Sequence, residues 1–496
     1  MIFKHHAIQQ LSIFLLGVAI LVWVFLSGYE KRNHLNEVYQ RGVLRVAVVV
    51  NPSVYWPEPD ATKGFEYDLI EKYAHSQNLK TYYQVVNTRE QLLRAINLNT
   101  ADVAISGHTV MFQKEQSQGY ASYLDPDYLG RSLTTIDIFP ATAQVLYHSS
   151  YLPAGKKLES ISQLQGLNIT VAKGSPYAKL VQSWKQQWPD IKWHEENGHS
   201  IDLLKLLDEG LTDIVILPST EVRINEVYFP DIDIAFDASA QLPIVWEIGI
   251  DRDDSLLKNI NGFISQVQET GELAIMIERY FGHLDQGPYY VNPQRFEKLI
   301  KTRLTQYMPL FQQSANDNEL DWRLLAAISH QESHWRANAI SPTGVRGLMM
   351  LTRATALEMG FKDRIKPQNS IEGGARYIKK LSGRISKEIK EPDRTWFTLA
   401  SYNVGLGHVN DARKLCEQIG KDPNEWIDVK ECLPLLLDPI WHKQTKYGYA
   451  RGNEPVTYVQ NIRQYYDLLK WHFGEELEVE TNIIKPQIEI SVPSGL

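Results

Sequence analysis

The sequence predicts an α/β domain of two lobes followed by a mainly α-helical domain. Its 496 residues exceed what one hydrophobic core usually serves, so two or more domains are expected. From about residue 43 to 285, short β-branched runs alternate with amphipathic stretches, which is the pattern of an α/β fold. From Pro293 onward, helical patterns dominate instead.

The α/β part shows a repeated unit. Its expected strands are 44–50, 81–86, 102–107, 167–172 and 213–218, and its expected helices are 64–74, 90–97, 178–186 and 201–209. Residues 100–105 and 211–216 look like one unit used twice, which favours two parallel-sheet lobes. The runs 144–148 and 244–250 are expected to cross between the lobes. Residues 255–282 are expected to form two closing helices, and the break at 285–288 predicts the domain boundary.

The composition excludes some functions. The content is 43% hydrophobic and 22% charged, as in a globular protein, and the formal charge of -8 offers no general field for nucleic acid. The two cysteines, Cys416 and Cys432, form no Cys-x-x-Cys or Cys/His cluster, so neither a metal nor another cofactor is expected. In an oxidising compartment they could form a disulfide; two buried thiols are the alternative, and their spacing does not decide.

The N-terminus predicts export. Lys4 precedes an apolar run from Leu11 to Leu26, and Lys31 and Arg32 follow it. Residues 1–28 are therefore either a signal peptide or a membrane anchor. No cysteine lies there, which excludes lipid attachment of the lipoprotein kind. The rest of the chain is expected outside the cytoplasm.

Three short segments of the α/β domain suggest ligand binding: 64–69 (Gly-Phe-Glu-Tyr-Asp-Leu), 102–107, and 173–175 (Lys-Gly-Ser). They resemble the periplasmic solute-binding proteins that carry amino acids to transporters. That family grips the ligand carboxylate with an arginine, and Lys114 falls near this position as a point charge. The family's acid after the second-lobe strand is replaced here by Leu217-Pro218-Ser219. A free amino acid, a cell-wall peptide and a purely regulatory or scaffolding lobe all remain open.

The helical domain carries a candidate acid, Glu332. Leu325 and Ile328 recur at helical spacing, and Glu332 continues their apolar stripe, in a helix that Asp321 is expected to cap. Burial on that face would raise the pKa of the carboxyl, and a protonated acid is what a leaving glycosidic oxygen needs. The alternative is a solvated glutamate near a helix end, paired with Arg336.

Two later segments accompany Glu332-Ser333. A turn-rich loop, 341–352, begins Ser-Pro-Thr-Gly-Val-Arg-Gly-Leu-Met, and residues 401–405 read Ser-Tyr-Asn-Val-Gly. In this order the segments resemble the catalytic domain of the soluble lytic transglycosylase family, which implies a goose-type lysozyme-like fold. Met350 stands where many members carry glutamine, and Ser401 replaces the usual alanine.

The resemblance implies that Glu332 is catalytic. It also implies substrate-binding residues, each with a plainer alternative. Ser341 positions Glu332 or an N-acetyl group, or it makes a local turn. Tyr402 lines the cleft and Asn403 binds sugar, or they only end a helix. Met349 and Met350 form an apolar wall or belong to the core. Tyr458, in a Tyr-Val-x-x-Ile segment, reaches the cleft or is a core tyrosine.

The whole organisation resembles the membrane-bound lytic transglycosylase F family. The domains are expected to be a leader at 1–28, the solute-binding-like regulatory domain at 29–286, the catalytic domain at 287–474 and an extension at 475–496. The resemblance implies a peptidoglycan lytic exotransglycosylase, a lyase that cleaves the MurNAc-GlcNAc β-1,4 bond of glycan strands, leaves 1,6-anhydro ends and serves wall turnover and remodelling.

Several points stay open after this resemblance. Endolytic or exolytic cleavage cannot be read, and Glu358, Asp363 and Glu372 lie close enough in sequence to supply a second acid. A hydrolase of lysozyme type and a non-enzymatic sensor of cell-wall fragments are the rival functions. The family's place is the periplasmic side of the outer membrane; an inner-membrane anchor formed by residues 11–27 is the alternative.

Overall fold

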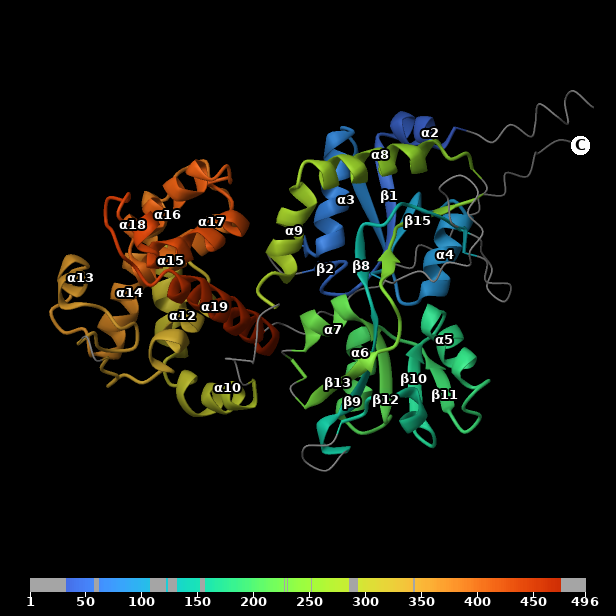
Figure 1. Ribbon diagram of the computed structural model, residues 1–496, viewed down its shortest axis with the longest axis horizontal. Coiled ribbons are helices and arrows are strands. Elements are labelled where there is room, and N and C mark those ends of the chain that lie inside the picture. Colours follow the sequence, from blue (N-terminus) through green and yellow to red (C-terminus); the bar gives the residue numbers. More distant parts are fainter. Residues whose placement is uncertain are drawn as a thin grey trace, which may run out of the picture.

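The computed structural model describes residues 33–57, 62–107, 122–123, 132–151, 157–226, 228–229, 231–250, 252–284, 293–341 and 344–473. An α/β domain of two lobes precedes a helical, lysozyme-like domain, as the sequence predicts (Figure 1). The leader, Lys114, the expected boundary and the C-terminal extension lie outside the described residues. Among the helices that are described, none is long and apolar enough to cross a membrane.

The first lobe is built on a six-stranded sheet of order β4-β1-β5-β15-β7-β6. Its strands are β1 (Val43–Val49), β4 (Lys80–Val86), β5 (Val103–Ile105), β6 (Ser122–Tyr123), β7 (Ser132–Thr134) and β15 (Glu247–Gly249). Its helices are α2 (His34–Arg41), α3 (Phe65–Ser76), α4 (Arg89–Asn97), α8 (Ser255–Glu269) and α9 (Glu272–Phe281). Strand β1 is mostly buried because helices cover the sheet, which explains its continuous apolar run.

The second lobe repeats the unit around a five-stranded sheet of order β11-β10-β12-β9-β13. Its elements are β9 (Ala143–His148), β10 (Asn168–Ala172), α5 (Pro176–Trp184), β11 (Lys192–Glu196), α6 (Ser200–Asp208), β12 (Ile214–Pro218), α7 (Ser219–Asn225) and β13 (Ile232–Asp237). Strand β12 lies parallel to β10 as β5 lies parallel to β1. The predicted duplication is therefore confirmed, whereas β11 and β13 were missed because their faces are half exposed.

The crossing strands were predicted in the wrong place. Residues 144–148 lie in β9, inside the second sheet, and β15 lies inside the first. The lobes are instead connected by a short antiparallel ladder of β8 (Phe139–Ala141) and β14 (Leu242–Ile244). Pro140 faces Pro243 in this ladder, and since proline lacks an N–H the ladder cannot widen into a sheet. Prolines also hide such strands from pattern analysis.

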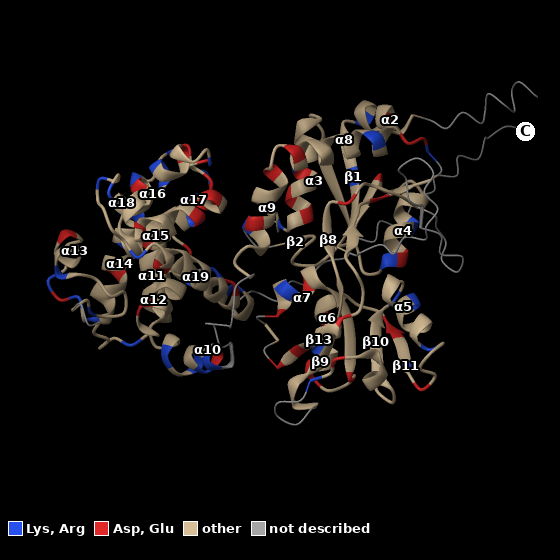
Figure 2. Cartoon of the chain, viewed as in Figure 1, with Lys and Arg blue, Asp and Glu red and all other residues tan. Residues whose placement is uncertain are grey.

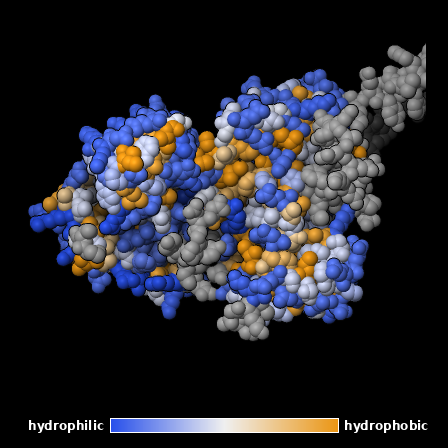
Figure 3. Space-filling view, in the orientation of Figure 1, coloured by the Kyte–Doolittle hydropathy of each residue, from blue (hydrophilic) through white to orange (hydrophobic). Residues whose placement is uncertain are grey.

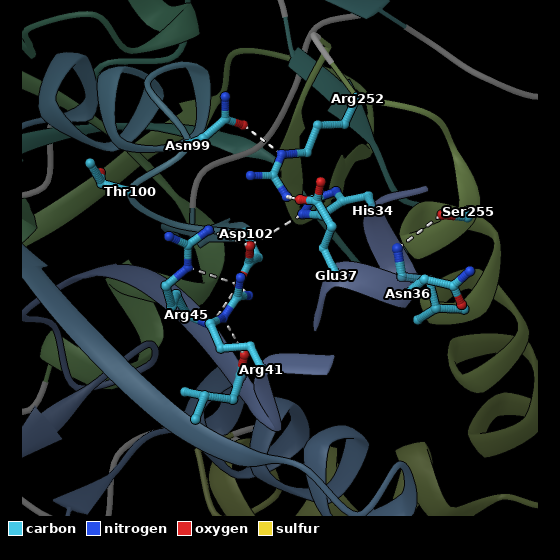
Figure 4. A network of polar contacts seen from close by, with 12 residues as sticks. His34, Asn36, Glu37, Arg41, Arg45, Asn99, Thr100, Asp102, Arg252 and Ser255 are labelled. Carbon is cyan, nitrogen blue, oxygen red and sulfur yellow. Dashed lines mark hydrogen bonds and ion pairs between the residues drawn. The ribbon is translucent and has the colours of Figure 1, made fainter. Parts of the chain in front are cut away.

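Asp102, immediately before β5, ties the first lobe together (Figure 4). The Arg45 side chain donates to both carboxylate oxygens, at 2.7 Å and 3.2 Å, and its backbone N–H donates at 2.9 Å. Arg41 and His34 complete the network. Burial alone would raise the pKa of Asp102, but these hydrogen bonds and the charge of Arg45 hold it well below its usual range.

The helical domain is packed around α19 (Asn453–His472), which contacts both α12 (Trp322–Ser333) and α15 (Asp393–Val404) extensively. The other helices are α10 (Pro293–Leu299), α11 (Met308–Asn318), α13 (Arg353–Glu358), α14 (Pro367–Arg384), α16 (Leu406–Gln418), α17 (Trp426–Cys432) and α18 (Pro439–His442). Residues 316–318 end α11, and Glu319 after them takes the left-handed conformation. The full length of α19 was not predicted.

A disulfide joins Cys416, in α16, to Cys432, in α17, which decides the alternative that spacing left open. Basic side chains gather on α10, whereas acidic ones are prominent on α3 and α9 (Figure 2). Figure 3 shows hydrophobic side chains beside the junction of the two domains on this face of the molecule.

Replacing Asp102 by asparagine is expected to lower the free energy of unfolding at pH 7 by roughly 3 kcal/mol, because Arg41, Arg45 and His34 lose their shared anion. Since the pKa of Asp102 is lowered, its contribution exists above the ordinary value near 4 and is lost as the pH falls further. Chemical denaturation at pH 7 and pH 3 would measure both effects. The control is Asp254→Asn, which removes an exposed pair with Lys258 and should change stability by less than about 0.5 kcal/mol.

Candidate active site

Glu332 lies in the last turn of α12, where the predicted stripe reaches the helix end. Asp321 caps the helix as expected, accepting from the Arg323 backbone N–H at 2.8 Å. Leu325 and Ile328 are fully buried, so the face that carries Glu332 is the apolar one. Glu332 is therefore half-buried at the end of this apolar face.

The chain leaves α12 through two consecutive left-handed residues. His334 has φ 51° and Trp335 has φ 54°, a conformation that costs free energy for residues other than glycine. The strain is held by partners: the buried Trp335 indole donates to Ala326 O at 2.9 Å, and Arg303 donates to His334 O at 3.0 Å. These bonds fix the backbone immediately after Glu332.

Tyr458, from α19, is the hydrogen-bond partner of Glu332. Its hydroxyl donates to Glu332 Oε1 at 2.6 Å. Burial raises the pKa of Glu332 to about 7, against a smaller lowering by this hydrogen bond. Within the described part of the chain no ion pair involves Glu332, and Arg336 is exposed, so the solvated alternative is wrong. Tyr458 is itself buried and faces the candidate acid.

Tyr402 approaches the same carboxyl from α15. Burial raises the pKa of Tyr402 well above its usual value, and the nearby charge of Glu332 raises it further. The Tyr402 hydroxyl donates to Met349 O at 2.7 Å, so it holds the loop backbone. Both Tyr402 and Asn403 lie in the last turn of α15, so they do end a helix, and Asn403 is exposed.

The loop after Ser341 is held closely against α12 and α14. The Ser341 hydroxyl accepts from the Val345 N–H at 3.2 Å, which is the local turn interaction. Gly347 has φ 88°, and a Cβ there would lie 2.2 Å from Arg364 O, so only glycine fits. The Arg364 guanidinium donates to Leu351 O at 2.7 Å and to Gly344 O at 2.9 Å. The loop backbone is therefore clamped at both ends.

The two methionines of the loop have different places. Met349 is fully buried and touches Gly374 of α14, where a Cβ would lie 2.7 Å from the Met349 side chain. Its backbone N–H donates to Ser370 Oγ at 3.1 Å. Met349 therefore belongs to the core. Met350 is only partly buried and adopts φ 46°, so it remains the methionine that can face a ligand.

The three acids considered as second carboxylates have other partners. None of them is among the groups that shift the pKa of Glu332. Glu358 pairs with Lys380, Glu372 with Arg376 at 2.7 Å, and Asp363 accepts from Ile365 N–H at 3.0 Å. Among the described residues, the titratable groups shown to interact with Glu332 are the phenols of Tyr458 and Tyr402.

Comparisons with known proteins agree with this geometry. Residues 309–424 match the transglycosylase SLT domain, and residues 44–283 match the bacterial extracellular solute-binding proteins, family 3. The membrane-bound lytic murein transglycosylase F of Stutzerimonas stutzeri is 38% identical over 473 residues, covering 95% of this chain and 93% of that protein. Its counterpart in Pseudomonas putida strain F1 is 37% identical over 497 residues, covering 99% of each. The chain belongs to the membrane-bound lytic murein transglycosylase F family.

Among solved structures, the P235GK mutant of ArgBP from T. maritima matches with a TM-score of 0.42 and 19% identity, covering 50% of this chain and 99% of that one.

Sequence reasoning missed the residues that hold the loop. The Ser333 hydroxyl lies 2.9 Å from Leu348 O and 3.0 Å from Ser329 O, and Ser329 Oγ donates to Leu348 O at 3.1 Å. The signal for Ser333 was its place directly after Glu332 in the motif. Arg364 and Ser370 had no such signal, because their roles depend on the folded loop. No cluster of metal-ligating side chains exists among the described residues.

An acid between the two lobes was also missed. Glu221, on α7 of the second lobe, accepts hydrogen bonds from Asn51 and Ser53 of the first lobe. Burial raises the pKa of Glu221, and the Ser53, Asn51 and Ser200 hydrogen bonds lower it. The family's acid was expected at residues 217–219, whereas Glu221 lies two residues later, in the first turn of α7. This carboxyl group connects the lobes.

Replacing Glu332 by glutamine is expected to stabilise the protein above neutral pH. The pKa of Glu332 is raised in the fold, so its favourable contribution is present below about 4.5 and is lost as the pH rises through about 7. At pH 8 the wild type carries a desolvated charge that glutamine lacks, a difference of up to about 3 kcal/mol. Thermal unfolding of both proteins at pH 5 and pH 8 would measure it.

The matched control is Glu319→Gln, an exposed acid of the same domain that pairs with Lys379. It removes the same formal charge without removing a buried group. An equal pH dependence in the two variants would contradict the burial of the Glu332 charge.

Proposed function

We propose that Glu332 is the single acid and base of a lytic transglycosylase that leaves 1,6-anhydro-MurNAc ends. Membership of the family makes the chain a peptidoglycan-cleaving lyase. One observation carries the finer proposal: a buried carboxyl group with a pKa of about 7, bonded to Tyr458 and lacking a second carboxylate among its described neighbours. A pKa near the working pH suits a group that must give a proton and then take one.

The chemistry follows from this arrangement. Glu332 gives its proton to the oxygen between MurNAc and GlcNAc, and the C1–O bond breaks. The N-acetyl group of MurNAc supports the cationic carbon. The Glu332 carboxylate then takes the proton of the C6 hydroxyl while O6 bonds to C1, which closes the anhydro ring. No water is consumed, and an internal hydroxyl has the high effective concentration that the step needs.

The environment of Glu332 supports this route over hydrolysis. Ordinary glycosidases place two carboxylates across the scissile bond, and the acids considered for that place pair elsewhere. In the carboxylate stage, Tyr458 donates to the anion and steadies it. The phenol of Tyr402 keeps Met349 O, and so the loop, beside the acid. A sensor without catalysis would have no need for such an acid.

Substrate contacts are assigned to the same region. Asn403 is exposed at the end of α15 and is proposed to bind a sugar through its amide. Met350 is proposed as an apolar wall for a sugar ring. Ser341 is proposed to stabilise the loop turn through its hydrogen bond with Val345. The turn in that conformation would allow the glycan to come close to Gly344.

The α/β domain is proposed to regulate cleavage. Cell-wall peptides or amino acids are the proposed ligands, since the family that this domain matches consists of solute-binding proteins. The relatives' name supports membrane association. We propose residues 1–28 as the leader or anchor, a boundary near 286, and attachment to the periplasmic side of the outer membrane, with wall turnover and remodelling as the role. An inner-membrane anchor at 11–27 is the alternative.

Replacing Glu332 by glutamine is expected to lower the rate of peptidoglycan cleavage by at least about a thousandfold, because the amide cannot give a proton at neutral pH. Turbidity loss of purified peptidoglycan would measure the rate. Mass spectrometry of the wild-type products should show anhydro ends. Hydrated reducing ends would indicate a hydrolase, and retained activity in the variant would remove Glu332 from the mechanism.

Cell-wall peptides are expected to change the cleavage rate of the full-length protein, because the proposed ligand acts on the α/β domain and not at Glu332. The rate would be measured with and without peptides released from peptidoglycan, at saturating glycan. Glu332→Gln is the blank. A rate that does not respond at any peptide concentration would contradict regulation by this class of ligand.

A further inference from the structure

Two opposite faces of helix α19 contact different parts of the protein. Tyr458, Ile462, Tyr465 and Leu469 recur at helical spacing and are buried in the core of the helical domain. The opposite face contacts the α/β domain through another set of side chains: Gln460, Arg463, Gln464, Asp467 and Trp471. One helix therefore carries Tyr458 to Glu332 and also docks on the other domain, as its position beside the end of α9 in Figure 1 suggests.

The first lobe is held by a buried polar network. The Arg463 guanidinium donates to Arg279 O at 2.6 Å and to Glu278 O at 3.2 Å. The His283 ring lies 2.8 Å from the Asp467 carboxylate, and Gln464 donates to His283 O at 2.9 Å. Because Arg463 is almost fully buried, an unsatisfied guanidinium would be costly, and the network resists separation.

The second lobe is held by an aromatic stack. The ring of Trp471 lies 4.5 Å from that of Tyr228, at an interplanar angle of 21°. Tyr228 follows α7, the helix whose Glu221 bonds to Asn51 and Ser53 of the first lobe. The lobes therefore meet each other at Glu221, and both meet α19.

A packed helix of 20 residues, about 30 Å long, behaves as a rigid body. The lobes are connected by the narrow β8-β14 ladder, which permits a hinge motion. A movement of one lobe relative to the other has two possible outcomes for α19. The helix either loses its contacts with one lobe, or it follows one lobe and shifts against α12, which carries Glu332. Either outcome changes the support of Tyr458.

We propose that α19 couples the relative position of the two lobes to the hydrogen bond between Tyr458 and Glu332. Arg463 and Trp471 are positioning residues in this scheme, acting through Tyr458. The inference rests on the proposed role of Glu332 and adds the path by which the α/β domain reaches it. Arg463 also lies over the Trp396 ring, at 4.7 Å, on the helix that carries Tyr402.

The pH dependence of cleavage would report this coupling. The titratable groups that face Glu332 are the phenols of Tyr458, from α19, and of Tyr402, from α15. The Tyr458 hydrogen bond lowers the pKa of Glu332, so losing it raises that pKa. The protonated acid then persists to higher pH, and the alkaline limb of the rate profile moves up. Tyr458→Phe sets the size of this shift.

The test uses two variants of the full-length protein, Trp471→Ala and Tyr228→Ala, each of which removes one ring of the same stack. If one variant does not fold, the other still tests the coupling. Each is expected to move the alkaline limb up by about half a pH unit and to lower kcat about fivefold with KM little changed. The control, Lys430→Met, removes an interdomain ion pair with Glu278, at 2.7 Å, that comes from α17 and not from α19, while Glu278 keeps its contact with Arg463, at 3.7 Å. Because α19 keeps its own contacts in this variant, kcat and the profile should stay within about twofold of wild type.

Hydrogen exchange supplies a readout that needs no activity. In both stack variants the amides of 453–465 should exchange about tenfold faster than in wild type, and in Lys430→Met they should not. Unchanged exchange together with an unshifted profile would overturn the coupling, as would equal effects in Lys430→Met. If wild type released nothing from peptidoglycan, the proposed function would fail, while the exchange experiment would still decide the coupling.

Discussion

The constraint on which the rest of the site depends is the desolvation of the Glu332 carboxyl group, with no cation paired to it in the described part of the chain. Asp102 provides the comparison inside the same chain. Both acids are withdrawn from water. Two arginines and a histidine bind Asp102, and the His34 and Arg45 contacts lower its pKa, whereas Glu332 has the Tyr458 phenol as its hydrogen-bond partner and its pKa rises to about 7. Burial with cations makes a structural anion, and burial without them makes a proton donor.

Such a group is useful only if it is held still, and the surrounding backbone is fixed from several sides. Ser333 and Tyr402 bind carbonyls of successive loop residues, Leu348 and Met349. Arg364 binds carbonyls on either side of them. His334 and Trp335, which follow α12 in the left-handed conformation, are strained, but their hydrogen bonds with Ala326 and Arg303 hold them in place. The loop therefore presents a preorganised wall to the acid, which reduces the cost of arranging the site when a substrate binds.

The two domains are not structurally independent. Helix α19 contributes to the core of the helical domain and also to the interface between the two domains. Its inner face carries Tyr458 and its outer face carries Arg463 and Trp471. A movement of one lobe against the other can in this way act on the acid through a single rigid element. Coupling of this kind needs differential contacts in two states, and the lobe hinge supplies the motion.

Much of this protein could be predicted from local pattern. The alternation of strands and helices, the duplicated strand unit, the cap at Asp321 and the apolar stripe ending at Glu332 follow from periodicity and capping, which depend on near neighbours in the chain. Residue motifs also singled out Tyr402 and Tyr458. The crossing strands were misplaced because Pro140 and Pro243 weaken the strand pattern.

The sequence by itself singled out Glu332 as the candidate acid, together with the segments that accompany it, because residue type and spacing carry that information. Only the tertiary structure decided that Cys416 bonds to Cys432, that Tyr458 and not Arg336 is the partner of Glu332, and that Glu221 and α19 connect the lobes and domains. Those contacts join residues far apart in the chain, 170 positions for Asn51 and Glu221 and 185 for Glu278 and Arg463. A desolvated pKa is likewise a property of everything that surrounds a group in space.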